Sequence, residues 1–210
     1  MLKKTLAVAL AAATLCAGTA FASKTDELYA RYNNGAAVQE PGSSYKEAKE
    51  YTAVLIGSQQ EYLDRQDLFF GIIAEEMNDN LTPGRQRVVC DKAVQAKWIE
   101  FCNSTAHTGE HILQPEELAE FAAQQAQPVL FIYATEDITY GQKKKYDDGR
   151  FKTENTANQR FVLVLADKNG IGKRYEFTVE GDSKHSRDRA LVDAFEEAMD
   201  EGEKMIFFMR

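Results

Sequence analysis

The chain has 210 residues, of which 33 are acidic and 25 are basic, and its formal net charge is −8. This acidic balance argues against nucleic acid or an anionic membrane as a partner, because both require clustered lysine and arginine. It permits a basic protein partner, and it is also what keeps many exported proteins in solution.

The first 22 residues have the pattern of a cleaved export signal. Two lysines at positions 3 and 4 precede an apolar run over 6–15, and Ala20-Phe21-Ala22 supplies the small residues that signal peptidase requires. The apolar run is shorter than the roughly 20 residues that span a bilayer. Leu15 precedes Cys16, where lipoprotein signals usually carry a small residue, so cleavage is favoured over lipid attachment.

We therefore expect cleavage after Ala22 and a periplasmic or secreted protein of residues 23–210. The signal takes two lysines and no acidic residue, so the net charge of the remaining chain becomes −10. Its length fits a single domain. We expect residues 23–127 to form a helical part and residues 128–210 to form a sheet part.

Residues 44–77 are predicted to form one long amphipathic helix. Ser43 or Ser44 can cap its start, and Gly57 and Gly71 weaken it enough to allow a kink or a break at either position. The predicted buried stripe is built on a seven-residue repeat of Ala48, Leu55, Tyr62 and Phe69.

The cysteines that follow the signal, Cys90 and Cys102, flank a stretch with helical propensity. In an unbroken helix they would lie about 18 Å apart, whereas a disulfide requires Cα atoms about 4.4–6.8 Å apart. An exported chain with an even pair of cysteines favours the disulfide. We expect Cys90 and Cys102 to be bonded and the chain to bend between Asp91 and Lys97.

The sequence offers few candidate sites for chemistry. His107 and His111 are spaced as ligands of a transition metal could be, but Gly109 between them disfavours the helix that would align their rings. No nucleophile elbow, C-x-x-C pair or phosphate-binding glycine loop is present. We expect no cofactor, and the sequence favours a non-catalytic protein over an enzyme.

The second half changes to the period of strands. We predict a helix from Pro115 to Gln127, a short strand from Val129 to Tyr133, and a hairpin over residues 160–180 that turns at Asn169-Gly170. A helix near 186–201 and a final strand over 205–209 complete the pattern. Residues 134–159 fit either a hairpin turning at Asp147-Asp148-Gly149 or a mobile functional loop.

One cluster in this polar stretch is unusual for an acidic chain, because three lysines stand between two tyrosines. It suggests a protrusion that binds an acidic or polysaccharide partner, or lysines that guard an edge strand. The residues are Tyr140, Lys143, Lys144, Lys145 and Tyr146.

The predicted fold is α+β, with a helical N-terminal half packed on a mostly antiparallel four-stranded sheet. Our working hypothesis is a non-catalytic binding protein of the bacterial cell envelope, such as an inhibitor, immunity or accessory factor. Its expected partner is a protein, and we expect neither nucleic acid binding nor membrane insertion after signal cleavage. A hydrolase with scattered acid–base residues and a small-ligand carrier stay open as alternatives.

Overall fold

The computed structural model describes residues 50–56, 62, 64–81, 86–104, 115–147 and 149–208. The predicted signal segment and its cleavage site, and His107 and His111, lie outside these residues. Within them, no helix is long and apolar enough to cross a membrane.

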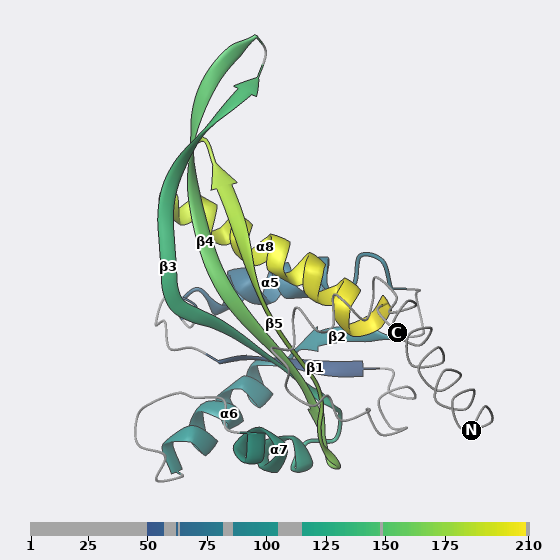
Figure 1. Cartoon of the computed structure of the whole chain (residues 1–210). Helices are drawn as coiled ribbons and strands as arrows, with labels where there is room; N and C mark the ends of the chain where they lie inside the picture. The colour runs from purple at the N-terminus through teal and green to yellow at the C-terminus, as the bar shows by residue number, and fades with distance from the viewer. Residues whose placement is uncertain are drawn as a thin grey trace, which may run out of the picture.

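A five-stranded mixed sheet organises the described part of the chain, in the order β2-β1-β3-β4-β5 (Figure 1). β1 runs parallel to both of its neighbours, β2 and β3. β3, β4 and β5 then follow as an antiparallel meander. The strands are β1 (Glu50–Ile56), β2 (Arg87–Cys90), β3 (Val129–Asp147), β4 (Arg150–Asp167) and β5 (Gly170–Ser183).

The predicted fold, a helical first half on a four-stranded antiparallel sheet, is wrong. Two of the five strands, β1 and β2, come from the half that was expected to be helical, and they make the sheet mixed. Six of the seven residues of β1 are buried because it lies inside the sheet and is covered on both faces. A strand of this kind has an unbroken apolar run, which periodicity cannot distinguish from a buried helix.

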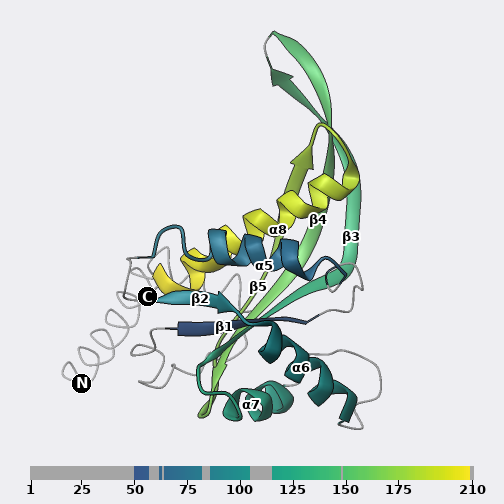
Figure 2. The same cartoon turned by 180° about the vertical axis from the view of Figure 1, so that it is seen from behind.

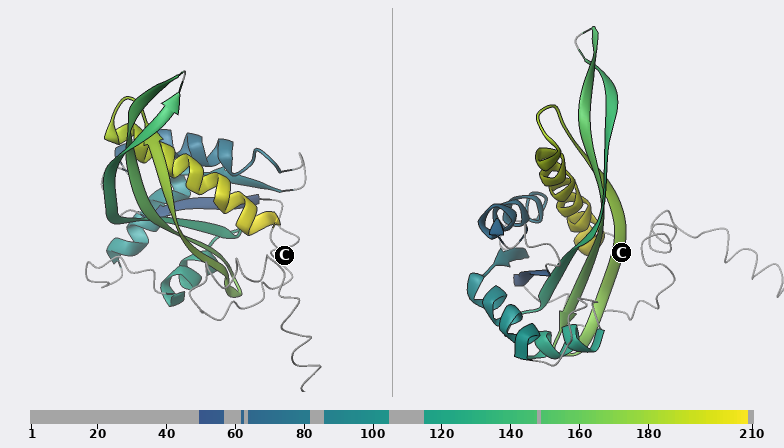
Figure 3. Two further views of the ribbon diagram at one scale, coloured as in Figure 1. Left: turned by 45° about the horizontal axis from the view of Figure 1, so that its top comes forward. Right: turned by 90° about the vertical axis from the view of Figure 1, so that its left-hand side faces the viewer.

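Helices cover both faces of the sheet (Figures 2 and 3). α5 (Gln66–Glu76) and α8 (Arg187–Glu203) lie on one face, and α6 (Lys92–Ser104) and α7 (Pro115–Ala123) lie on the other. Each face has its own apolar core, because alternate residues of the central strands point to opposite sides.

The two cores share the strands but not the side chains. On the α5–α8 side, Phe69, Phe161 and Phe195 pack together, with ring centroids 4.8 and 5.8 Å from Phe195. On the other side, Trp98 packs against Phe121 and Phe131 at 5.1 and 5.2 Å. These aromatic clusters fix the two helical layers against the sheet.

The predicted final strand is also wrong. Residues 204–208 continue from α8 as a π-helical segment, η1 (Lys204–Phe208), and Met205 and Ile206 are buried. Its carbonyl groups accept hydrogen bonds from β5: the Tyr175 hydroxyl donates to Met205 at 2.8 Å and the Lys173 ammonium to Ile206 at 2.7 Å.

Other elements of the second half are confirmed. β4 and β5 form the expected hairpin, with Gly170 at a φ of 117° in the turn. α8 begins at the expected place, where the Ser186 hydroxyl accepts a hydrogen bond from the Arg189 amide at 3.1 Å. Residues 134–159, which fitted either a hairpin or a mobile loop, belong to the long β3–β4 hairpin.

Candidate functional site

The β3–β4 hairpin extends well beyond the rest of the sheet and forms a protruding arm (Figures 1 and 3). We call residues 138–159 the arm. β5 accompanies it only as far as Ser183, which lies opposite Asn155. Residues 142–155 end the arm, which continues as two strands beyond the pair of Asn155 with Ser183, and we call this part the tip. A two-stranded hairpin is only marginally stable by itself in water.

A buried polar contact holds the arm at its base. The pairing of β3 with β4 shifts register between Ala134 and Ile138, where β3 bends. Gln159 is fully buried beside this bulge. Its amide nitrogen donates to the Thr135 carbonyl at 2.8 Å, and its amide oxygen accepts from the Tyr62 hydroxyl at 2.6 Å. These bonds connect β4 to the bulge in β3 and to Tyr62 at the base of the arm.

Two aromatic rings are exposed at the tip. Tyr146 and Phe151 are Cα partners across the hairpin, with 66% and 74% of their surfaces accessible. Their ring centroids lie 5.2 Å apart at an interplanar angle of 65°. Gly149, at a φ of 75°, permits the tight turn that brings them together. Both rings project from the same face of the arm.

Ion pairs connect the arm to the end of β5. The Lys143 ammonium lies 2.6 Å from Asp182 and 3.0 Å from Glu180. These hydrogen bonds, the one with Asp182 first, raise the pKa of Lys143 to about 12. The same lysine lowers the pKa values of Glu180 and Asp182.

A buried carboxylate continues this network. Glu154 is only 1% exposed, and its oxygens lie 3.8 Å from the Lys145 ammonium and 3.9 Å from the Lys184 ammonium. Lys145 also lies 4.0 Å from Asp182. Much of the positive charge predicted for this region is therefore used to hold the arm to β5.

The structure separates the five predicted arm residues into two groups. Tyr140 faces the start of α8, with the Arg187 guanidinium 5.7 Å from its ring centroid, and Lys143 and Lys145 are in ion pairs. Lys144 and Tyr146 are exposed, and they lie on one face because they are two residues apart in a strand.

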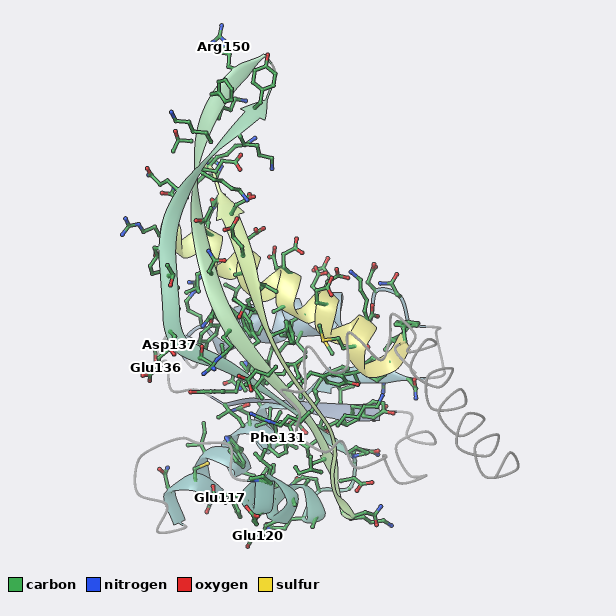
Figure 4. The ribbon with its side chains drawn as sticks, in the orientation of Figure 1. Glu117, Glu120, Phe131, Glu136, Asp137 and Arg150 are labelled. Carbon is green, nitrogen blue, oxygen red and sulfur yellow. The ribbon has the colours of Figure 1, made fainter. Side chains whose placement is uncertain are left out.

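Two tip residues were not predicted, Phe151 and Arg150. Figure 4 shows Arg150 at the far end of the arm, and Phe151 lies next to it in β4. The tight turn that contains Gly149 pairs Tyr146 with Phe151. The sequence could have predicted this pair, because a hairpin turning at Asp147-Asp148-Gly149 was one of the two alternatives for residues 134–159.

Acidic side chains gather between the C-terminal ends of α5 and α8. Burial and the nearby charges of Glu196, Glu75, Asp200 and Asp79 raise the pKa of Glu76, and burial together with Asp193, Glu75 and Glu197 raises that of Glu196. No basic residue lies in the last turn of either helix. Lys204, directly after α8, pairs with Asp200 and Glu201 at 2.5 and 3.4 Å.

The structure does not contain the predicted disulfide. Cys90 and Cys102 are both free thiols. Cys90 packs against the core beneath α5 and α8, and Cys102 packs against the core beneath α6 and α7. The sheet separates the two sulfurs, and α6 runs unbroken through the segment where a bend was expected.

Among the residues that the structure describes, no three histidine, cysteine, aspartate or glutamate side chains form a group that could hold a metal ion. His107 and His111 lie outside these residues and remain a candidate pair predicted from the sequence.

Neither a family model nor a curated protein sequence matches the chain. Solved structures that resemble it include a hypothetical protein from Chlamydia trachomatis, with 12% identity and a TM-score of 0.38 over 75% of this chain and 98% of that one. A putative neuraminyllactose-binding hemagglutinin homolog from Helicobacter pylori has 11% identity and a TM-score of 0.37, over 78% and 81%. A minor lipoprotein from Acinetobacter baumannii has 10% identity and a TM-score of 0.32, over 76% and 89%. Similarities this low assign neither a family nor a function.

Proposed function

We propose that the chain is an exported, non-catalytic binding protein of the bacterial cell envelope that contacts a protein partner through the tip of its arm. The observation that carries the proposal is the exposed pair Tyr146 and Phe151 at the end of a two-stranded protrusion. Export is the part of the proposal that rests on the N-terminal sequence pattern.

Aromatic side chains exposed to water at the end of an arm have an unfavourable free energy, which is relieved when a partner covers them. Aromatic residues are enriched at the centres of protein interfaces, where they bury a large area and lose little side-chain entropy. Each ring exposes well over half of its surface, while the aromatic residues of both sheet cores are almost fully buried. The tip therefore has the composition of a binding site and makes no contribution to either core.

The charge of the tip restricts the chemistry of its partner. Residues 143–152 include five basic residues and two acidic ones, although the whole chain is acidic. A partner surface with an apolar recess bordered by carboxylates would complement it. A basic partner, which the net charge of the chain permits, would instead meet the acidic ends of α5 and α8.

Site-specific crosslinking in cells tests the proposal. A photo-crosslinking amino acid at position 146 should give a discrete protein adduct, and the same group at exposed Lys168, in the β4–β5 turn, should give none. Phe151→Ser in the position-146 variant should reduce the adduct strongly, because the ring beside the crosslinker contributes to the same contact. Equal labelling at positions 146 and 168, or no adduct at position 146, would contradict the proposal.

A further inference from the structure

The outer face of α5 is a second uncovered surface, and it is apolar along its middle. Leu68 exposes 41% of its surface, and Gly71 and Ala74 are exposed at the following three-residue steps. A Cβ atom placed on Gly71 would meet no atom within 4 Å, so the surface there is open. The apolar strip ends at exposed Glu75.

We infer that this α5 face binds the arm tip of a second copy of the same chain. In this contact Phe151 and Tyr146 cover the strip of Leu68, Gly71 and Ala74, and Lys144 pairs with Glu75. The inference rests on the proposed function, because it identifies the protein that the tip contacts.

The spacing of the two surfaces supports the contact. On α5, Glu75 lies four residues beyond Gly71, which is about 6 Å along the helix axis. On the arm, Lys144 lies two residues before Tyr146 on the same face, which is about 7 Å along the strand. An aromatic ring placed over open Gly71 therefore brings the Lys144 side chain to the carboxylate of Glu75.

Charge supports the same pairing. Glu75 stands beside Glu76 and Glu196, and burial, followed by the charges of neighbouring carboxylates, raises the pKa of both. A lysine brought to this place relieves the repulsion. The tip supplies Lys144, and Arg150 lies next to Phe151 at its end. A basic, aromatic tip and an acidic, apolar-centred helix face are complementary in both respects.

The geometry makes the contact intermolecular. The tip projects beyond both α5 and α8 at one end of the molecule, so a chain cannot place its tip on its own α5 (Figures 1 and 3). Because tip and helix face are different surfaces, the association is head-to-tail and leads to a ring or an open chain of copies.

Sedimentation velocity of the full chain, purified after export, tests the inference. At low salt the average mass should rise with protein concentration, and high salt should oppose the rise. Lys144→Glu and Glu75→Lys should each weaken association by about tenfold or more, since each places like charges in contact. An equimolar mixture of the two variants should recover association with the two variants alternating one to one, because both contacts between unlike copies pair opposite charges, whereas contacts between like copies do not.

Matched charge reversals on other elements serve as controls. Lys168→Glu changes an exposed residue of the β4–β5 turn, and Glu120→Lys changes an exposed residue of α7, which Figure 4 labels. Both substitutions should leave the association unchanged. A chain that sediments as a monomer at every concentration, or a mixture that does not recover association, would overturn the inference. In that event crosslinks from position 146 to a different protein would still support the proposed function, whereas loss of all crosslinks would remove both.

Discussion

Gln95 completes the hydrogen bonding of β1 beyond the point where β2 ends. The last residue paired with β2 is Ala53, and beyond it the buried Gln95 side chain forms hydrogen bonds with the backbone of buried Leu55. The Gln95 amide oxygen accepts from the Leu55 N–H at 2.8 Å, and its amide nitrogen donates to the Leu55 carbonyl at 2.8 Å. One side chain thus substitutes for a strand neighbour.

Replacing this amide by an apolar group should therefore be costly. Gln95→Leu leaves a buried N–H and a buried C=O without partners, and we expect a loss of about 2–4 kcal/mol in the free energy of unfolding. Urea denaturation followed by circular dichroism measures it. Gln124→Leu, at an exposed position after α7, should change the value by less than about 0.5 kcal/mol. Equal effects of the two substitutions would show that the Gln95 bonds are not important.

The two thiols should be unreactive in the folded protein. Burial raises the pKa of Cys90 to about 12, and burial with the charge of Glu117 raises that of Cys102 to about 11. The thiolate is the reactive form, so alkylation near pH 8 should be slow in the native state and fast in denaturant. Mass spectrometry of the unreduced exported chain would count the added groups. A chain that accepts none even in denaturant would contain the disulfide expected from sequence.

At the residue level, composition locates the segment rich in lysine and tyrosine but does not show which of its side chains project from the arm. The run of lysines and tyrosines is distinctive in composition, and it does lie in the arm. Which of them are available depends on β5, because Glu180 and Asp182 occupy Lys143 and Asp182 lies near Lys145. That neighbour is fixed by strand pairing more than 30 residues away, which local patterns do not encode.

Among the elements, α8 and β5 are in unusually close contact. Gly181 of β5 lies directly beneath the α8 backbone, and a Cβ atom there would collide with the Ala194 amide and the Ala190 carbonyl. These are backbone atoms of a helix, and moving them would disturb the hydrogen bonds of α8. Two alanines and a glycine thus set the separation between helix and sheet.

Gly181→Ala should destabilise the protein by about 3 kcal/mol or more, because the added methyl group would collide with the backbone of α8, which cannot shift without disturbing the helix. Gly71→Ala is the matched substitution, at an open helical position, and should stabilise by up to about 1 kcal/mol through helix propensity. Thermal unfolding of both variants gives the comparison. A tolerated Gly181→Ala would mean that α8 packs less closely on β5 than the structure shows.

The ion pairs between the arm and β5 should make stability depend on pH. The pKa values of Glu180 and Asp182 are lowered in the folded state, so their contribution is present above their ordinary values near 4 and is lost as the pH falls below them. All three side chains are partly exposed, which limits the effect to less than about 1 kcal/mol.

Lys143→Met provides the measurement. Its cost in the free energy of unfolding should be greatest at neutral pH and low salt, and should shrink at pH values below the carboxyl range. Exposed Lys168→Met is the control and should show no such dependence. A cost that does not change with pH would attribute the role of Lys143 to packing of its aliphatic chain.

The elements that sequence predicts correctly are those whose signals are local. The β4–β5 hairpin has a turn sequence between apolar runs, and α8 has a serine cap with a buried stripe after it. The segment of β1 was predicted as helix because Leu55 in its apolar run, Tyr62 and Phe69 are spaced by seven residues. All three residues lie in the core beneath α5 and α8, but Leu55 reaches it from β1, and Tyr62 and Phe69 reach it from the segment that follows β1.

For the whole molecule, the mixed sheet could not be predicted because its pairings are distant in sequence. β1 pairs with β2 across 37 residues and with β3 across 77, as the register of Glu50 with Arg87 and of Thr52 with Val129 shows. Parallel strands require such crossovers, and nothing in the strands themselves specifies the partner. The α+β class follows from composition and period, whereas the strand order requires the tertiary structure.

In this topology the proposed binding site lies apart from the apolar cores. The two large cores lie where helices cover the five strands, and the base of the arm has only a small cluster of Ala157, Ala190 and Leu191. The tip beyond β5 belongs to none of the three. We therefore expect that the tip can be removed while the fold is kept.

The register of the hairpin allows a clean deletion. Gly141 and Thr156 are Cα partners, so joining them through Asn-Gly, the preferred two-residue hairpin turn, removes residues 142–155 without shifting β3 against β4. The free energy of unfolding should fall by about 1–2 kcal/mol, because the tip makes no apolar core contacts and the deletion removes the ion pairs with β5 and those of buried Glu154. Self-association and partner capture should both be lost, as measured by sedimentation and by pulldown from envelope extract. A shortened chain that still assembles would place the interaction elsewhere on the molecule, and one that unfolds would make the tip part of the fold.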